Sequence, residues 1–399
     1  MMKPKIRFNG FTDDWEQRKL GDVAQITMGQ SPAGSTYSDV PSDYILVQGN
    51  ADLENGWVKP RVWTTQITKQ AYIGDLIMSV RAPAGAMGKT SYNAVIGRGV
   101  AAIKGNEFIY QLLVKMDKEG YWKKDSTGST FESLNSESIK NAEIKLPSNE
   151  EQTVIGTYFE QLDHLITLHQ RKCDGLKKLK KYMLQNMFPQ NGEKTPKIRF
   201  QGFINAWEQR KLEEIYQNIG NAFVGTATPY YVDTGHFYLE SNNIKDGQIN
   251  RNNEVFINDE FYERQKDKWL HTGDMVMVQS GHVGHTAVIP EELDNSAAHA
   301  LIMFRNPKIE IEPYFLNYQY QTIKSKRKIN NITTGNTIKH ILASDMYNFI
   351  VDVSDIEEQQ QIANYFLELD HLITLHQRKV EQMKNLKKYM LQNMFPAEK

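Results

Sequence analysis

Basic, hydroxyl and amide side chains gather beside two short polar turns of this chain. One turn reads Thr-Thr-Gly-Asn-Thr over residues 333–337, and the other reads Ser-Thr-Gly-Ser-Thr over residues 126–130. Basic residues lie shortly before both turns. Basic side chains neutralise phosphates, and small hydroxyl and amide groups reach phosphate oxygens or base edges. The pattern favours local contact with a nucleic acid. The alternative is a solvated basic helix end, which the helix dipole stabilises in any case.

The candidate contact residues lie at these turns, in the basic runs beside them, and just after strands. Asparagine and glutamine can bind adenine through two hydrogen bonds, and arginine can bind guanine in the same way. The candidates in the first half are Gln48, Asn50, Arg81, Lys89, Lys123, Lys124, Thr127, Ser129 and Thr130. The candidates in the second half are Ser241, Asn242, Asn243, Gln279, Ser280, Lys324, Lys326, Arg327, Lys328, Thr334, Asn336, Thr337 and Lys339.

Two other motifs suggest cofactor or metal binding and fall short of it. Residues 85–90 read GAMGKT, but a phosphate-binding loop needs a glycine where Pro83 stands. His282 and His285 have no acidic or cysteine partner at metal-ligand spacing. The sequence also contains no Gly-x-Ser-x-Gly nucleophile motif. We therefore expect a chain with no catalytic site, no metal and no bound cofactor. An enzyme with an unrecognised site in the region 271–285 remains an alternative.

The composition indicates a soluble protein of two or three domains. The chain has 399 residues, a formal net charge of −1 and 40% apolar residues. A charge so close to zero produces no global positive field, so any surface for nucleic acid must be local. The single cysteine, Cys173, rules out a framework of disulfides. No apolar run approaches the length of a membrane span, and we expect a cytoplasmic protein without membrane contact.

A long element occurs twice in the chain, at an offset of 207 residues. DHLITLHQRK spans residues 163–172 and again 370–379, and LKKYMLQNMFP spans 179–189 and again 386–396. Apolar steps of three, four and seven predict a helix in each copy, with a heptad seam that packs against a partner helix. The predicted seam contains Ile155, Leu162, Leu165, His169, Leu176, Leu179 and Met183, and in the second copy Ile362, Leu369, Leu372, His376, Met383, Leu386 and Met390. Ser148 with Glu151, and Ser354 with Glu357, predict capping boxes at the two helix starts.

A shorter element is also repeated. PKIRFNGFTDDWEQRKL spans residues 4–20, and PKIRFQGFINAWEQRKL spans residues 196–212. The second copy directly follows the first long helix, whereas the first copy opens the chain. If both copies pack alike, the N-terminal segment should lie against the C-terminal helix, which gives a pseudo-twofold molecule.

The segments between the repeats differ in sequence but share landmarks. A Gly-Asp pair precedes an apolar strand at residues 74–78 and again at 273–277, which indicates a turn that enters a buried strand. Short strands mixed with one or two helices predict a mixed α/β domain in each segment. The expected parts are residues 1–20, a repeated element; 21–148, domain one; 149–189, the first long helix; 190–212, a linker with the repeated element; 213–355, domain two; and 356–399, the second long helix.

This doubled order resembles the specificity subunit of a type I restriction-modification system over nearly the whole chain. The resemblance rests on the PKIRFxGFxxxWEQRKL opener, the Gly-Asp landmark, the Glu-Glu-Gln helix starts at 150–152 and 357–359, and the repeated helix ends. It implies two α/β target-recognition domains separated by two long antiparallel coiled-coil helices. It further implies that each domain reads one half of a bipartite, asymmetric site on double-stranded DNA, with a non-specific spacer between the halves.

The resemblance also implies the partners. They are two modification subunits, which methylate adenine with S-adenosylmethionine, and two restriction subunits, which use ATP and Mg to translocate and cleave DNA. This chain itself would be non-catalytic. The alternative is a structural adaptor that carries two protein-binding modules on a coiled coil and does not bind DNA.

Overall fold

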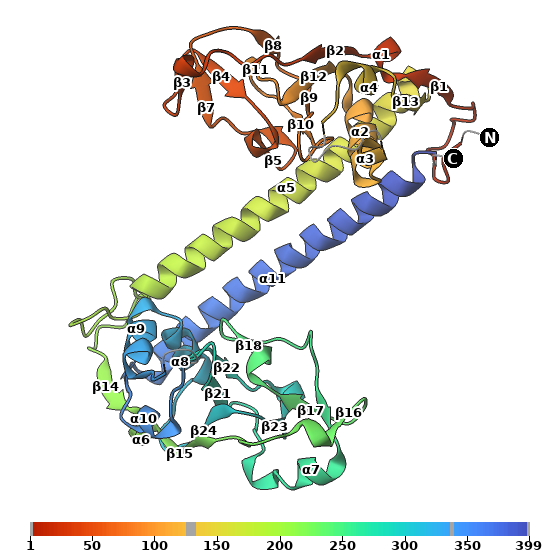
Figure 1. Ribbon diagram of the computed structural model, residues 1–399. Coiled ribbons are helices and arrows are strands. Elements are labelled where there is room, and N and C mark those ends of the chain that lie inside the picture. The colour runs from red at the N-terminus through yellow and green to blue at the C-terminus, as the bar shows by residue number, and fades with distance from the viewer. Residues whose placement is uncertain (1–2, 125–132, 336–338, 397–399) are drawn as a thin grey trace. The chain divides into compact units, whose positions relative to one another are not determined.

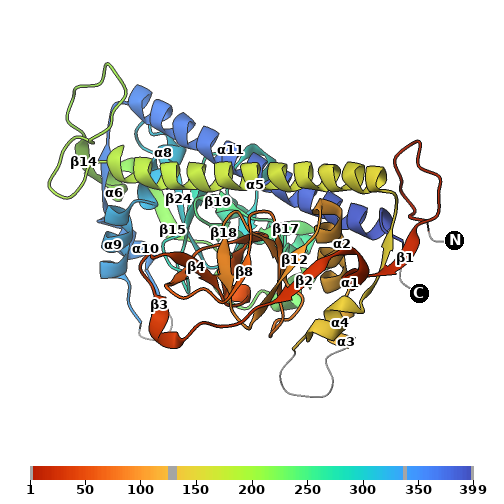
Figure 2. The same cartoon turned by 90° about the horizontal axis from the view of Figure 1, so that it is seen from above.

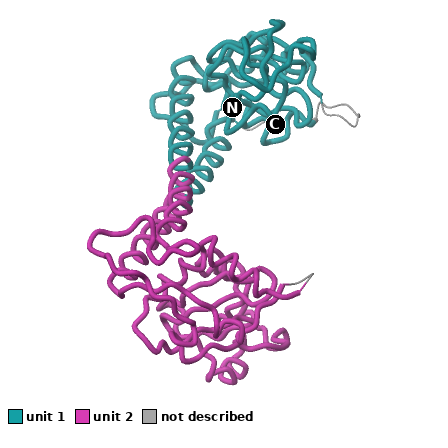
Figure 3. The backbone as a smooth tube through the Cα atoms, turned by 90° about the vertical axis from the view of Figure 1, so that its left-hand side faces the viewer, with its two compact units in different colours: residues 1–170, 377–399 teal, residues 171–376 magenta. Residues whose placement is uncertain are grey.

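The computed structural model describes residues 3–124, 133–335 and 339–396. The chain forms two compact units, shown in Figure 3. Unit 1 contains residues 1–170 and 377–399, and unit 2 contains residues 171–376. Each long helix therefore contributes one part to each unit. Unit 1 combines segments from both ends of the chain, whereas unit 2 is one continuous segment.

The globular part of unit 1 is built on a six-stranded and a five-stranded sheet (Figure 1). The first has the order β2 (Gln25–Met28), β12 (Val100–Lys104), β9 (Leu76–Ser79), β10 (Met87–Lys89), β6 (Trp57–Val58), β5 (Leu53–Glu54). The second has the order β3 (Tyr37–Ser38), β7 (Val62–Thr64), β4 (Tyr44–Val47), β11 (Ala94–Ile96), β8 (Lys69–Ala71). A separate pair joins β1 (Glu16–Lys19) to β13 (Glu143–Leu146). The short helices are α1 (Leu20–Val23), α2 (Glu107–Lys118), α3 (Tyr121–Lys124) and α4 (Ser136–Lys140).

Unit 2 repeats this plan with smaller sheets. One four-stranded sheet has the order β15 (Tyr216–Asn221), β24 (Leu301–Pro307), β21 (Met275–Val278), β22 (Thr286–Val288). The other has the order β16 (Tyr231–Val232), β20 (Phe256–Ile257), β17 (His236–Leu239), β23 (Ala297–Ala298). The remaining pairs are β18 (Ile244–Lys245) with β19 (Gln248–Ile249), and β14 (Glu208–Lys211) with β25 (Ile350–Val353). The short helices are α6 (Leu212–Ile215), α7 (Asp259–Glu263), α8 (Pro313–Tyr320), α9 (Ile323–Ile332) and α10 (Ala343–Tyr347).

The two predicted long helices are present as α5 (Asn149–Asn186) and α11 (Ile356–Asn393), each of 38 residues. They run side by side and antiparallel within each unit (Figures 1 and 2). One half of the predicted capping box is confirmed at the first start, where the Ser148 hydroxyl accepts the Glu151 N–H at 3.3 Å, while the Glu151 carboxylate binds Arg7. The prediction is wrong at the second start. There the helix begins one residue after Asp355, and the Ser354 hydroxyl donates to the Asp355 carbonyl at 3.4 Å.

The predicted heptad seam is partly wrong. Ile155 and Leu162 are buried as expected, but Leu165 is 43% exposed and Leu179 is 41% exposed. Cys173 and Leu184 are buried instead, at steps of 11 residues from Leu162, and the second copy buries Ile362, Leu369, Val380 and Leu391 in the same pattern. Residues seven positions apart are offset by about 20° around a straight helix, so a strict seven-residue spacing gradually leaves the buried face. The change to steps of eleven residues keeps the buried side chains on that face.

The repeated short element joins the start of one long helix to the end of the other. In unit 1, Arg7 forms two hydrogen bonds of 2.7 Å with buried Glu151, and the Ile6 N–H donates to the Asn393 carbonyl at 2.9 Å. Unit 2 repeats both contacts, between Arg199 and Glu358 and between the Ile198 N–H and the Asn186 carbonyl. The prediction that the N-terminal segment lies against the C-terminal helix is therefore confirmed.

Each unit has an aromatic core at this junction. In unit 1 the Phe395 ring packs against Trp15, Phe108 and Phe159, with centroid distances of 6.1, 5.1 and 5.9 Å. In unit 2 Phe188 packs in the same way against Trp207, Phe315 and Phe366. The final Met-Phe of each repeated helix end therefore joins the core of the globular domain in the same unit.

Candidate nucleic-acid interface

The Gly-Asp landmark is a structural turn. Gly74 and Gly273 have φ values of +91° and +88°, which glycine adopts without steric cost. The following aspartate closes each turn: Asp75 accepts the Tyr72 N–H at 2.9 Å, and Asp274 accepts the His271 N–H at 2.8 Å. The turn directs the chain into β9 or β21, whose side chains are all buried. The landmark therefore positions the loop at the far end of this strand.

In both domains that loop contacts residues that follow the polar turn. In unit 1 the Leu134 N–H donates to the Val80 carbonyl at 2.9 Å, and Arg81 forms a β-bridge with Ser133. In unit 2 the Ile341 N–H donates to the Gln279 carbonyl at 3.0 Å, and Ser280 forms a β-bridge with His340. In unit 2 candidates that are far apart in the sequence are thereby brought together, since the Gly281 N–H, next to Ser280, donates to the Lys339 carbonyl. We name the loop 80–86 with its neighbour Ser133 junction 1, and the loop 279–285 with residues 333–335 and 339–340 junction 2.

A helix packs against the loop of each junction, α3 in unit 1 and α9 in unit 2. An ideal Cβ on Gly85 would lie 2.5 Å from the Trp122 ring, and one on Gly284 would lie 2.8 Å from the Ile329 side chain. Both glycines also have positive φ. Close approach of the loop to the helix thus requires glycine at this place in both domains.

Exposed cations lie in junction 2 and on helix α9 beside it. Lys326, Arg327 and Lys339 are exposed, while Thr334 is exposed and Ser280 half-buried beside them. In unit 1, Arg81 and Lys123 are exposed. Thr127, Ser129, Thr130, Asn336 and Thr337 lie outside the described residues, as does the side chain of Lys124.

Three of the predicted contact lysines are engaged in contacts within the protein. Lys89 bonds Glu107 at 2.8 Å, lies over the Trp57 and Tyr110 rings, and is 12% exposed. Lys324 is 9% exposed, bonds Asp352 and donates to the Pro189 carbonyl at 3.1 Å. Lys328 donates to the Ile350 carbonyl at 3.0 Å, and burial lowers the pKa of this lysine. Lys324 and Lys328 stand one turn apart on α9 and face the protein, and Lys89 on β10 also faces inward. These three lysines therefore stabilise the fold.

The polar candidates that follow strands also differ in their exposure: one is buried, four are half-buried and one is exposed. Asn243 is 3% exposed; its Oδ1 accepts the Glu240 N–H, and its Nδ2 donates to the Asn250 carbonyl, both at 2.9 Å. Its side-chain amide therefore closes a turn inside the domain. Gln48 and Asn50 are half-buried around an equivalent turn that Asp52 closes, and Gln279 and Ser241 are also half-buried. Asn242 is exposed.

The sequence analysis considered His282 and His285 only as metal ligands and missed their hydrogen bonds at junction 2. His282 Nε2 lies 2.9 Å from the Ser241 carbonyl oxygen, and the Asp246 N–H donates to His285 Nδ1 at 3.2 Å. Burial lowers the pKa of His285, more than nearby Asp246 raises it, which keeps this ring neutral as the acceptor. Because the partner carbonyls and N–H groups belong to distant turns, the sequence spacing held no signal for these contacts. A polar cavity of about 230 Å³ lies beside them, lined among others by Asp246, His285 and Lys326.

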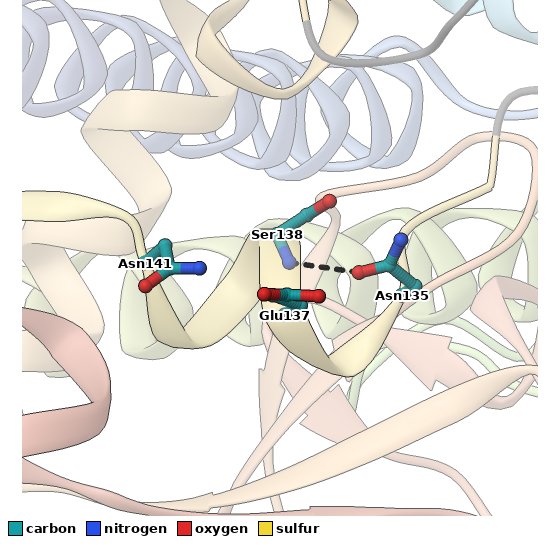
Figure 4. Close-up of a pocket in the computed structure, with 4 residues that line it drawn as sticks. All are labelled: Asn135, Glu137, Ser138 and Asn141. Atoms are coloured by element: carbon teal, nitrogen blue, oxygen red, sulfur yellow. Dashed lines mark hydrogen bonds between the residues drawn. The ribbon is translucent and has the colours of Figure 1, made fainter.

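Another hollow, on helix α4, is a helix cap. It is lined by Asn135, Glu137, Ser138 and Asn141, and the Asn135 side chain accepts the Ser138 N–H at 2.8 Å (Figure 4). The carboxylate of Glu137 is unsuited to phosphate. Within the described part of the chain, no group of three His, Cys, Asp or Glu side chains could hold a metal ion. None of the described helices has the length and apolar character that a membrane span requires.

Comparison with known proteins explains the doubled architecture. The family described as "Type I restriction modification DNA specificity domain" matches residues 12–178 and again residues 204–385. The chain belongs to this family. Its resemblance to the specificity subunits is thus confirmed, and each half of the chain is one copy of the specificity domain.

Two relatives of this specificity-family chain come from Methanocaldococcus jannaschii. The putative type I restriction enzyme MjaX specificity subunit is 29% identical over 190 residues, which cover 45% of this chain and 44% of that protein. The type I restriction enzyme MjaVIII specificity subunit is 21% identical over 395 residues, which cover 95% of this chain and 91% of that protein. The first match therefore spans less than half of that relative, and the second spans nearly all of its relative.

Solved structures show the same fold. The S subunit of a type I restriction-modification system from M. genitalium superposes with a TM-score of 0.63 and 14% identity, over 100% of both chains. A chain from a structural study of complex assembly and conformational transition of the type I R-M system superposes with a TM-score of 0.52 and 16% identity, over 98% of this chain and 100% of that chain. The predicted architecture, two mixed α/β domains with two long helices in a repeated order, is confirmed.

Proposed function

We propose that each globular domain reads one half of a bipartite, asymmetric site on double-stranded DNA, and that the long helices set the non-specific spacer between the halves. The observation that carries this proposal is the pair of junctions. Both domains build the same junction from the same backbone bonds, and each borders it with exposed cations, Arg81 and Lys123 in one and Lys326, Arg327 and Lys339 in the other. Exposed cations neutralise phosphates, while the small polar groups between them reach base edges.

The difference between the junctions supports an asymmetric site. The loop of junction 1 reads VRAPAGA and that of junction 2 reads QSGHVGH. Side chains that read bases must match the donors and acceptors of the base pairs they contact. Two loops with such different side chains would therefore select different half-sites.

In this proposal the chain is a non-catalytic subunit that works with its partners in the cytoplasm. Two modification subunits would supply adenine methylation with S-adenosylmethionine, and two restriction subunits would supply ATP- and Mg-dependent translocation and cleavage. The chain would bind none of these cofactors itself. Its contribution is to place the modification subunits at a chosen DNA sequence.

The long helices offer two equivalent docking faces for the modification subunits. In unit 1 the large apolar side chains exposed on the helices include Leu165, Leu168, Leu386 and Tyr389. In unit 2 they include the repeat equivalents Leu372, Leu375, Leu179 and Tyr182. We name these the exposed helix sets. All eight are between 37% and 58% exposed, and the same residue types recur at the same repeated positions. Exposed apolar side chains repeated in this way suit two copies of one partner.

Salt-dependent binding and methylation mapping test the reading of DNA. The complex of this chain with its modification subunits should shift duplex DNA, with an affinity that falls steeply as salt rises. Mapping of methylated adenines in a host that expresses the system should give one bipartite motif with a constant spacer. Absence of any bipartite motif would overturn the proposal and favour a structural adaptor.

Disruption of one exposed helix set tests the docking. Changing Leu372 and Leu375 to aspartate should reduce the complex from two modification subunits to one, as measured by native mass spectrometry. Leu367→Asp is the matched control, because Leu367 is 36% exposed on the same helix but has Glu160 at the equivalent repeat position. Two modification subunits retained by the double variant would place the docking surface elsewhere.

A further inference from the structure

A carboxylate on each long helix binds both the neighbouring helix and the globular domain. In unit 2 the Lys180 Nζ of α5 lies 2.7 and 2.8 Å from the two carboxylate oxygens of Asp370 on α11. The Tyr318 hydroxyl of α8 donates to the same carboxylate at 2.9 Å. Lys180 also lies 5.1 Å above the Tyr318 ring. The side chains of Lys180 and Asp370 are 13% and 12% exposed, so solvent screens this pair little.

Unit 1 has the same arrangement with the helices exchanged. Lys387 Nζ of α11 lies 2.6 and 2.7 Å from the carboxylate oxygens of Asp163 on α5. The Gln111 side chain of α2 donates to Asp163 at 2.9 Å. Asp163 and Asp370 are equivalent in the repeat, as are Lys387 and Lys180. The two halves therefore form one reciprocal set of contacts.

The donor from the globular domain is the informative part. Asp163 and Asp370 lie in the repeated helices, whereas Gln111 and Tyr318 lie in the segments whose sequences differ between the two halves. Gln111 and Tyr318 stand at equivalent places, 207 residues apart, on helices α2 and α8. The domains have diverged in side chain at this place, yet each donates a hydrogen bond to the same carboxylate. Burial, followed by the charge of Asp370, raises the pKa of Tyr318, which keeps its hydroxyl protonated as a donor.

An ion pair between the two long helices fixes their axial register, which is the position of one helix along the axis of the other. Apolar faces of two helices can slide past one another at small cost, but a buried directional pair fits at one axial position. A slip of one residue moves a helix by about 1.5 Å, and this is enough to break a two-oxygen contact with a lysine. The same carboxylate binds the domain, so the register of the helices is transmitted to the domain that reads DNA.

We infer that Asp163 and Asp370 are positioning residues, which hold each recognition domain at a fixed register on the pair of helices and thereby determine the spacer length that the subunit accepts. This inference rests on the proposed function, because spacer length has meaning only for a bipartite site. It assigns to Lys180, Lys387, Gln111 and Tyr318 a role in spacing and none in reading bases.

The test uses the full chain in complex with its modification subunits. Once the motif has been mapped, affinities are measured for duplexes that carry the native spacer and spacers longer and shorter by one base pair. Tyr318→Phe removes only the donor from the domain, and Lys180→Met removes the tie between the helices. Each should reduce the preference for the native spacer by about 3- to 10-fold, the worth of one hydrogen bond, with unchanged half-site sequences. Lys180→Arg, which keeps a cationic donor, should restore the preference.

One control variant and one further test variant separate an effect on position from an effect on stability. Tyr365→Phe makes the same substitution on a tyrosine whose ring packs on Phe200, and it should leave the spacer preference unchanged. Gln111→Met tests the equivalent donor in unit 1 and should act as Tyr318→Phe does. If the variants bind all spacers more weakly by one common factor, the contacts are merely structural and the inference is wrong. If the unmodified complex itself accepts every spacer equally, the proposed function of the helices fails instead.

Discussion

The two recognition domains share their backbone frame and differ in what the frame displays. In both, the carbonyl of the first loop residue accepts an N–H from the chain after the polar turn, from Leu134 to Val80 and from Ile341 to Gln279. Below the loop, Trp122 occupies in one domain the place that Ile329 occupies in the other. Backbone hydrogen bonds do not depend on the identity of the side chains, so the same junction can present different residues in the two domains. This difference teaches that the frame supports the junction while the side chains remain free to set specificity.

Exchange of one recognition segment should produce the largest change. Replacing residues 21–148 with the equivalent segment of a relative should change one half-site completely and leave the other intact. The exchanged β13 pairs with β1 through backbone bonds, which do not depend on the identity of the side chains. Methylation mapping of the hybrid decides the outcome. A change in both half-sites together would contradict two independent readers.

Lengthening the helices should change the spacer and leave both half-sites intact. Sequence alone suggests duplication of one turn near Leu179–Leu184, but that segment contains Lys180, whose pair with Asp370 would shift. Four residues inserted after Arg171 in α5 and four after Arg378 in α11 preserve both ion pairs. The insertion adds about 6 Å, which corresponds to roughly one to two base pairs.

The control for this experiment is insertion into α5 alone, which should weaken binding because the helices no longer match in length. Methylation mapping of the matched variant should show a spacer longer by one or two base pairs. An active matched variant with its original spacer would mean that the helices hold the subunits together without determining the spacer.

Much of the frame was predictable because the repeat presents it twice. The long helices, and the placement of the N-terminal segment against the C-terminal helix, follow from two elements in the same order. The partners of the repeated charges were not predictable, since Arg7 and Glu151 lie 144 residues apart and meet only in the folded chain. Nor could a run of basic residues show that Lys324 faces Asp352 while Lys326 faces solvent. Which lysine is buried depends on how α9 packs against the domain, and sequence spacing alone does not predict that packing.

The basic run of α9 offers a test of that distinction. Lys324→Met leaves buried Asp352 without its cation and should lower the free energy of unfolding by about 3 kcal/mol, as broken buried pairs do. Lys326→Met with Arg327→Met should change stability by less than about 0.5 kcal/mol for each residue. The second variant should instead lower the slope of log affinity against log salt by up to about 0.9 for each phosphate that these cations neutralise. Urea denaturation and salt titration of DNA binding measure the two effects, and an unchanged slope would assign these cations to solvent.

The smallest expected effect is a pH dependence confined to the second domain. His299 Nδ1 lies 3.5 Å from the Glu240 carboxylate. The hydrogen bond to Glu240 raises the pKa of His299, and the bond from His299 lowers the pKa of Glu240. The raised histidine contributes stability that is complete below its unfolded pKa and lost as pH rises through its folded pKa. The lowered glutamate contributes stability above its unfolded pKa and loses it in acid. The pair should therefore stabilise unit 2 most between about pH 4.5 and 6.5.

The first domain provides the comparison. Ile96 pairs with Val47 as Ala298 pairs with Leu239, so Gly97 and Gln48 occupy the places of His299 and Glu240 and cannot form such a pair. Exchange of His299 for glutamine should cost up to about 1 kcal/mol at pH 5.5, since the pair is partly exposed, and less at pH 8. Urea denaturation at both pH values measures the difference. A loss of equal size at both would show that His299 acts through its bond to the Gly225 carbonyl, which a neutral ring also forms, and that its charge is immaterial.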